Sequence, residues 1–317
     1  MGIEKLGPFR LAPWFSPRPW GRKDLRPWYA ATGTTEPVGE AWLTGPESVV
    51  ETGAMAGQTL AAVTAEAGEA LLGALDQIGG PEFPLLVKLL FPNDKLSVQV
   101  HPDDAQAQAM GQARGKTECW YVLEAEPGAT IALGLKAGAT ADVVRSAIAA
   151  GTMEEWMEWV PVLVGDMVFV DAGTVHAIGP GVVLLETQQT CDVTFRMYDY
   201  GRPRELHVEQ ALKVMRAKTA AGKVQPQQMD GFVRLIEQKY FVVDRYDVAA
   251  DSNVVIPVRG ASCLVGIGGP PAMVQSEGQE SVFLSMGRAV VVPTGCDYVM
   301  VATTEAASFV HCFAPVS

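Results

Sequence analysis

The sequence predicts a mainly β protein with two β domains and a minority of helices. Two observations favour this class: Gly (32) and Pro (21) separate many short apolar runs, and several of those runs alternate apolar and polar residues with period two. With 317 residues, the chain exceeds one average domain and is long enough to bury a core without disulfides. We therefore expect β barrels or sandwiches, with helices added around them.

Three segments show helical periodicity. Residues 60–75 form one candidate helix, residues 140–150 place Val143, Val144 and Ile148 on one face, and residues 207–217 place Leu212 and Met215 inward. These helices are expected to lie around the β core.

A polar stretch over residues 217–229 has no periodicity and is typical of a linker. We place a domain boundary there, which gives a first, metal-binding catalytic domain over residues 1–220 and a smaller β domain over 221–317. The second domain has strand candidates at residues 233–236, 240–248, 263–267, 282–284, 289–292 and 309–313.

A weak internal repeat links the two domains. The spacing of Gly165, Gly173 and His176 recurs in Gly287, Gly295 and Tyr298. Each copy predicts a strand, a tight glycine turn and a second strand. The smaller domain is therefore predicted to be a diverged copy of the first, and because Tyr298 replaces His176 we expect no metal in it.

Charge and cysteine content exclude several classes of partner. The formal charge of -12 argues against nucleic acid or an anionic membrane as the main partner. Five scattered cysteines without a Cys-x-x-Cys pair predict reduced core residues. The first 20 residues lack the apolar run of a secretory segment, and no later stretch has the length of a membrane span. A soluble cytoplasmic protein is expected.

Three separated segments carry candidate metal ligands. Residues 96–101 alternate, so that Gln99 and His101 share one strand face. Glu118 begins a second strand, and His176 follows the turn at 171–173. Imidazole and carboxylate ligands with room for substrate are typical of an open catalytic zinc site. From the residues alone, a metal role and a structural role both remain open for His101 and His176.

The other two histidines have simpler interpretations. His207 lies among polar residues where a helix is expected to begin, which is typical of a surface or capping residue. His311 lies in an apolar strand candidate and is interpreted as a core histidine.

Several motifs closely resemble type I mannose-6-phosphate isomerases. The resemblance covers about residues 84–202 and includes a short N-terminal match, Gly39-Glu40-Ala41-Trp42. Its segments, in order, are Pro84-Leu85-Leu86-Val87-Lys88-Leu89-Leu90, Leu96-Ser97-Val98-Gln99-Val100-His101-Pro102-Asp103-Asp104, Lys116-Thr117-Glu118-Cys119-Trp120-Tyr121, Ala172-Gly173-Thr174-Val175-His176-Ala177-Ile178, Glu186-Thr187-Gln188-Gln189 and Asp192-Val193-Thr194-Phe195-Arg196.

This resemblance implies a cupin (jelly-roll) barrel with a second, smaller diverged β barrel. It also implies one zinc ion per chain, a sugar phosphate as partner, and interconversion of mannose 6-phosphate and fructose 6-phosphate. The zinc ligands that it implies are Gln99, His101, Glu118 and His176. The substrate-site residues that it implies are Lys116, Asp192 and Arg196. The short segment between Glu118 and His176 resembles the compact bacterial form. Asp171 departs from the family, which usually has Pro there. A monomer and a homodimer are both compatible with the sequence.

An aldose–ketose isomerase must polarise a carbonyl and move a proton between adjacent carbons through an enediol. Zinc can polarise the carbonyl, and Arg196 and Lys116 suit a phosphate or an oxyanion. Three proton carriers remain open: Asp192, a zinc-bound water, and Lys116 with a lowered pKa. A structural salt bridge between Asp192 and Arg196 is the alternative to catalysis.

Two rival functions are compatible with the same fold. One is a non-catalytic sugar-binding or regulatory cupin. The other is a cupin oxygenase, which would use iron and more histidine ligands than are found here.

Overall fold

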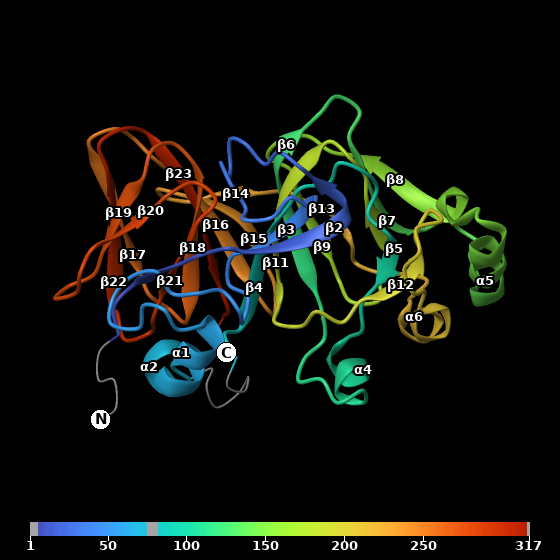
Figure 1. The fold of residues 1–317 in the computed structure, drawn as a ribbon, viewed down its shortest axis with the longest axis horizontal. Coiled ribbons are helices and arrows are strands. Elements are labelled where there is room, and N and C mark those ends of the chain that lie inside the picture. Colours follow the sequence, from blue (N-terminus) through green and yellow to red (C-terminus); the bar gives the residue numbers. More distant parts are fainter. Residues whose placement is uncertain (1–5, 75–81, 316–317) are drawn as a thin grey trace.

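In a computed structural model, the protein is an elongated stack of four β-sheets with helices at its lower edge and at one end (Figure 1). The structure describes residues 6–74 and 82–315. A five-stranded and a seven-stranded sheet form one half, and a second seven-stranded sheet and a four-stranded sheet form the other.

The first half is built mainly from residues 14–224. Its seven-stranded sheet has the order β13 (Gly222–Val224), β9 (Met167–Val170), β6 (Glu118–Ala125), β11 (Val182–Gln189), β4 (Leu85–Leu90), β3 (Val38–Trp42) and β2 (Trp14–Arg22). Its five-stranded sheet has the order β12 (Phe195–Tyr198), β5 (Val98–Val100), β10 (His176–Ile178), β7 (Thr130–Leu135) and β8 (Met157–Pro161). Trp120, Ile131 and Ile178 belong to a single core between these two sheets.

The second half repeats this arrangement. Its seven-stranded sheet has the order β1 (Phe9–Leu11), β21 (Ala289–Val292), β18 (Ser262–Gly268), β23 (Ala307–Phe313), β16 (Val242–Val248), β15 (Val233–Glu237) and β14 (Gln227–Gln228). The four-stranded sheet has the order β17 (Ser252–Pro257), β22 (Tyr298–Thr303), β19 (Ala272–Gln275) and β20 (Val282–Leu284). The sequence patterns did not identify β17 and β19.

The two seven-stranded sheets pack against each other. Their facing side chains, such as Leu89 and Leu185 on one sheet and Val265 and Val310 on the other, form the largest core. The central strand β4 is buried along its whole length, which explains its nearly uninterrupted apolar sequence. The mainly β class with few helices is confirmed. Each pair of sheets forms a jelly-roll sandwich whose sheets do not close into a barrel.

The predicted helices are present but shorter. Residues 60–75 form α1 (Leu60–Ala67) and α2 (Glu69–Leu72), which break at Gly68; Leu75 lies outside the described residues. Helix α5 (Ala141–Ala150) begins after the capping Thr140. Helix α6 (Val208–Val214) buries Ala211 and Val214, and Leu212 and Met215 pack partly buried against the same core, as expected. The other helices within the described residues are α4 (Asp104–Gln108) and the 3-10 turn η1 (Met153–Trp156).

Two strands extend beyond the segments that the sequence assigned to each domain. β13 lies in the linker yet pairs with β9 of the first half, and β1 near the N-terminus pairs with β21 of the second half. The boundary at residues 220/221 stays a prediction.

The five cysteines are buried and free, as predicted. None of the helices within residues 6–74 and 82–315 is long and apolar enough to span a bilayer.

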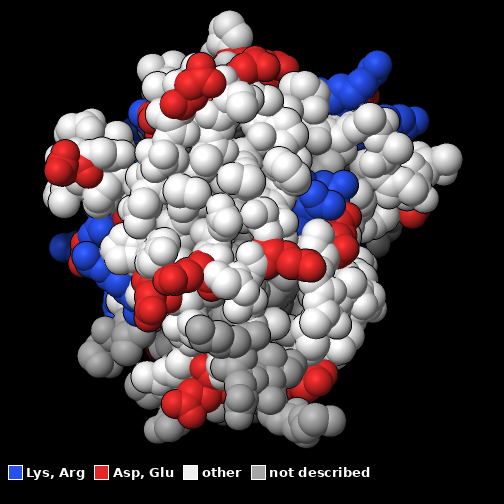
Figure 2. Space-filling view, turned by 90° about the vertical axis from the view of Figure 1, so that its left-hand side faces the viewer, with Lys and Arg blue, Asp and Glu red and all other residues white. Residues whose placement is uncertain are grey.

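Figure 2 shows the end of the molecule beyond the four-stranded sheet, where much of the surface carries no charged residue. Exposed apolar side chains at this end include Val255 and Phe283.

Candidate metal centre and active site

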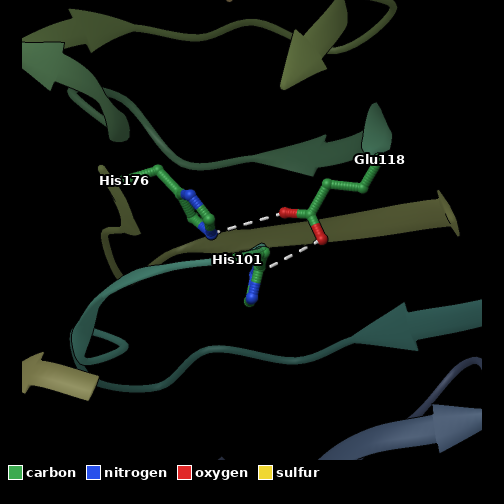
Figure 3. Close-up of side chains that lie close together, drawn as sticks. All are labelled: His101, Glu118 and His176. Atoms are coloured by element: carbon green, nitrogen blue, oxygen red, sulfur yellow. Dashed lines mark ion pairs between the residues drawn. The ribbon is translucent and has the colours of Figure 1, made fainter. Parts of the chain in front are cut away.

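His101, Glu118 and His176 come together inside the first sandwich (Figure 3). Glu118 begins β6, His176 begins β10 and His101 follows β5, so the cluster bridges the two sheets. The Nε2 atom of His176 lies 3.4 Å from Oε1 of Glu118, and Nε2 of His101 lies 3.7 Å from Oε2. All three side chains are at most 2% exposed. This is the convergence that the sequence predicted.

Backbone carbonyls fix the orientation of both imidazole rings. Nδ1 of His101 lies 2.9 Å from the carbonyl oxygen of Val193, and Nδ1 of His176 lies 2.9 Å from that of Thr174. Each Nδ1–H therefore donates outward, which leaves the Nε2 lone pair facing Glu118. Burial lowers the pKa of His176 to about 4 and holds that of His101 well below its usual value. Both rings are neutral near pH 7, the form that ligates metals.

Gln99 is the fourth predicted ligand, and it lies beside the cluster. Its side-chain amide is 3.3 Å from Nε2 of His176, and the two residues are directly paired across β5 and β10. The other amide atom is 3.3 Å from Oγ of Ser97, which could equally accept from the amide nitrogen if the group were turned by 180°. Gln99 can thus present its oxygen to the cluster.

The carboxylate of Glu118 has the environment expected of a metal ligand. Both of its oxygens are buried and have no hydrogen-bond partner of good geometry within the described chain. Nζ of Lys116 lies 3.0 Å from one of these oxygens, and a divalent cation between the carboxylate and the two imidazoles would supply the further partners that the buried group needs. Two imidazoles, one carboxylate and an amide oxygen are a donor set that zinc accepts in an open site.

The turn before His176 is held by Asp171, the residue that departs from the family. Its carboxylate accepts a 2.8 Å hydrogen bond from the hydroxyl of Thr174 and bonds of 3.0 and 3.1 Å from the backbone N–H of Ala220. Gly173 in this turn has φ +88° and donates to the carbonyl of His101. The turn therefore connects two of the candidate ligands.

Lys116 lies against the same cluster. Its Nζ is 3.0 Å from Oε2 of Glu118 and 3.1 Å from Nε2 of His101. Burial alone would lower the pKa of Lys116, but the carboxylates of Glu118 and Glu186 outweigh burial and raise it. Lys116 is therefore an ammonium, which differs from the lowered pKa that we considered from sequence.

A cavity of about 420 Å³ opens beside the cluster. Its wall includes Gln99 and Lys116, together with two residues to which the sequence patterns gave no role, Lys88 on β4 and Glu186 on β11. Lys88 lies 3.7 Å from Glu186 and 3.8 Å from Glu40, and its ammonium lies 4.4 Å from the ring centre of Trp42. A lysine within the apolar run Leu85–Leu90 is the sequence signal that identifies such a buried group.

Glu186 has an unusual ionisation. Burial and the neighbouring Glu118 raise the pKa of its carboxyl to about 7, against the lysines that lower it. Its Oε1 accepts a 3.2 Å hydrogen bond from Nε1 of Trp120. A carboxyl that titrates near neutral pH in a cavity can both accept and donate a proton.

Asp192 and Arg196 also line the cavity but do not pair with each other. Asp192 accepts a 3.0 Å bond from Lys88, whereas Arg196 donates to the carbonyl of Glu205 at 2.7 Å. The alternative of a structural salt bridge between them is wrong. Burial raises the pKa of Asp192, but Lys88 and Lys116 outweigh burial, so that its pKa is lowered and it remains a carboxylate.

Three arginines form one side of the cavity: Arg18, Arg196 and Arg204. Arg18 is paired with Glu40 and Arg204 with Asp199, whereas Nε of Arg196 is buried without a hydrogen-bond partner among the described residues. Converging guanidinium groups are typical of a phosphate site.

The remaining two histidines lie outside this cluster. His207 precedes α6 and is half-buried. Its ring accepts a hydrogen bond from the backbone N–H of Arg196 in β12, and its side chain makes no capping hydrogen bond to the helix. His311 is buried and stacks on Phe313, as the core interpretation predicted.

Comparisons with known proteins find similarity to mannose-6-phosphate isomerases. Residues 9–135 match the family model of the phosphomannose isomerase type I catalytic domain. The chain is 41% identical to the mannose-6-phosphate isomerase of Streptococcus mutans over 206 residues, which span 62% of this chain and 64% of that protein. It is 35% identical to the mannose-6-phosphate isomerase ManA of Bacillus subtilis over 262 residues, 78% of this chain and 81% of that protein.

A solved structure is similar over nearly the whole chain. The crystal structure of the mannose 6-phosphate isomerase from Bacillus subtilis superposes with a TM-score of 0.84 and 27% identity. The superposition covers 97% of this chain and 100% of the other.

Proposed function

This chain belongs to the type I phosphomannose isomerase family, and from that premise we propose that it is a zinc-dependent isomerase interconverting mannose 6-phosphate and fructose 6-phosphate. One observation carries the proposal: the buried cluster of His101, Glu118 and His176 lies beside a cavity whose wall includes three arginines.

We propose that Gln99, His101, Glu118 and His176 hold one zinc ion. Two features support this assignment: the neutral imidazoles are oriented by Val193 and Thr174, and the buried carboxylate of Glu118 makes no hydrogen bond of good geometry among the described residues. When bound, the ion supplies a Lewis acid that polarises the sugar carbonyl. Zinc suits this donor set better than the iron of an oxygenase, which normally has more histidine ligands.

The arginine side of the cavity is the proposed site of the phosphate group. Arg196 is the best candidate because its Nε has no partner while Arg18 and Arg204 are already paired with carboxylates. A sugar phosphate held there would extend toward Lys116 and the metal ligands, since the same cavity reaches both. Its volume of about 420 Å³ is within the range of small-molecule sites.

Glu186 is the proposed proton carrier. Asp192 is held ionised by Lys88, and Lys116 is protonated, so neither has the matched pKa that proton transfer in both directions requires. Glu186, with a pKa of about 7, can take the proton from one carbon and return it to the next. Lys88, 3.7 Å away, would stabilise its ionised form. Lys116 would stabilise charge that develops on the sugar oxygens.

A coupled assay that detects fructose 6-phosphate formed from mannose 6-phosphate tests the proposal. We expect turnover that depends on zinc. Saturable sugar-phosphate binding without product would indicate the non-catalytic cupin instead. Oxygen consumption together with bound iron would indicate the oxygenase.

A further inference from the structure

The second sandwich contains a cavity at the position that corresponds to the active site of the first. The strand order β9-β6-β11-β4-β3 in one seven-stranded sheet matches β21-β18-β23-β16-β15 in the other. In the smaller sheets, β5-β10-β7-β8 matches β17-β22-β19-β20. The two halves can therefore be compared residue by residue through their strand registers.

The registers place a different residue at each candidate ligand position. Tyr298 takes the place of His176 and Pro257 that of Gln99, because the members of each pair lie opposite one another across neighbouring strands. Ser262 takes the place of Glu118. Its partner on the neighbouring strand is Val292, and the partner of Glu118 is Val170. Arg259 follows Pro257 by two residues, as His101 follows Gln99. Pro257, Arg259, Ser262 and Tyr298 are not a metal-binding set.

The second half has a cavity at the position that matches the cavity of the first half. Lys88 and Glu186 are paired on neighbouring strands, and the corresponding pair in the second half is Asp244 and His311. Both pairs line cavities. The second cavity measures about 80 Å³, which is room for a few heavy atoms, since one water occupies about 30 Å³ of liquid.

Two arginines and one carboxylate line this cavity, and one of the arginines has no partner with which it forms an ion pair within the described residues. Arg234 donates bonds of 2.6 and 3.2 Å to Asp244 and is also paired with Glu237. Arg259, by contrast, lines the cavity, is exposed and has no hydrogen bond or ion pair within the described chain. Among the charged residues that line the cavity, Arg234 and Arg259 outnumber Asp244, so its lining carries a net positive charge.

His311 provides a second polar group inside the cavity. It is 6% exposed, and neither ring nitrogen has a hydrogen-bond partner among the described residues. A buried neutral imidazole has one N–H donor to satisfy. Phe232, Tyr246 and Phe313 make the walls apolar, which strengthens an electrostatic contact within them.

From these observations we infer that the second sandwich holds a metal-free site for a small oxyanion, a phosphate or carboxylate group, bound by Arg259 and by the N–H of His311. The site goes beyond the proposed isomerase activity and does not depend on it. It is too small for a whole sugar phosphate, so such a ligand would insert only its phosphoryl group.

The test follows the side-chain nitrogen signals of the four histidines by NMR in the full-length, zinc-loaded protein. His311→Asn assigns the His311 signal. Inorganic phosphate, acetate and mannose 6-phosphate are titrated separately, which distinguishes a free phosphate, a carboxylate and a sugar-bound phosphoryl group. We expect saturable movement of the His311 signal with at least one of them. No movement with any of the three would overturn the inference.

Arg259→Ala is the decisive variant. It should weaken binding at least about tenfold, because it removes a cavity-lining guanidinium that makes no hydrogen bond or ion pair among the described residues. Arg145→Ala, which removes an exposed arginine of α5, should bind as the unaltered protein does. Equal responses in the two variants would contradict the assignment. Lys88→Ala separates the two sites, since it should impair turnover and leave the His311 response intact.

Discussion

Lys88 and Glu186 are paired across β4 and β11, with Nζ of the lysine 3.7 Å from Oε2 of the glutamate, in strands that are buried along their whole length. Lys88 interrupts the apolar run of β4, Glu186 follows the apolar first half of β11, and both line the cavity beside the candidate metal ligands. Two buried ionisable groups in this position are expensive for the fold, which is why function is the better explanation for them.

Glu186→Gln should reduce kcat by about 100-fold or more, the usual contribution of a positioned acid or base. The amide is close in shape to the carboxyl but cannot carry the proton. The pH profile of the unaltered enzyme should show an ionisation that the variant lacks. Glu126→Gln, which alters an exposed carboxylate, is the matched control. A variant with unchanged kcat would exclude Glu186 as the proton carrier.

The same carboxyl should make stability depend on pH in protein stripped of metal. Because burial raises its pKa from 4.5 to about 7, the native state binds this proton more tightly than the unfolded state. The free energy of unfolding should therefore fall as pH rises between these values, by up to about 3 kcal/mol. Urea unfolding at about pH 5 and about pH 8 measures it. Glu186→Gln should lack this fall. An equal fall in the free energy of unfolding of the variant would show that another group causes it.

Removal of the metal should abolish isomerase activity. Dialysis against a strong chelator is expected to inactivate the enzyme, and added zinc should restore it. Glu118→Gln should lower the bound zinc, measured by elemental analysis, because the amide supplies no charge to balance the cation. Full activity in a preparation shown to contain no metal would contradict the ligand assignment.

Arg196→Ala should impair catalysis more than folding. We expect a loss of about tenfold to a hundredfold in kcat/KM, since a charged hydrogen bond to a phosphate contributes about 1.5–3 kcal/mol. The melting temperature should change little, because the side chain makes one hydrogen bond among the residues that the structure describes, to the carbonyl of Glu205. Arg145→Ala on the surface is the control. A variant that fails to fold would indicate a structural role.

Tyr298→Phe and His311→Asn should leave the zinc content unchanged. Both residues belong to the second sandwich, where the positions matching the candidate ligands carry other residue types. Elemental analysis of the purified variants measures this directly. Loss of one equivalent of zinc in either variant would place a metal in the second half.

Asp171→Ala should destabilise the turn that precedes His176. The variant loses the bonds from Thr174 and Ala220, at a cost of about 1–2 kcal/mol in the free energy of unfolding. Zinc affinity should fall as well, because the turn also contacts His101. Asp171→Asn keeps one acceptor and should lie between the two. An unchanged zinc affinity in Asp171→Ala would contradict a role of this turn in positioning the metal ligands.

Local patterns were sufficient for some elements and not for others. Thr140 and Gly151 bound α5 because a cap and a left-handed glycine are local signals. The strands β17 and β19 were missed, because which of their side chains are buried is decided by the sheet that they join.

The sequence by itself determined the mainly β class, the repeat between the two halves and the candidate ligands Gln99, His101, Glu118 and His176, because alternation, glycine turns and residue types are properties of the chain. Only the tertiary structure decided that the sandwiches stay open, that Asp192 pairs with Lys88 instead of Arg196, and that Glu186 titrates near neutrality. Those features depend on which charges burial brings within a few ångströms of each other, and the order of residues along a strand does not specify those distances.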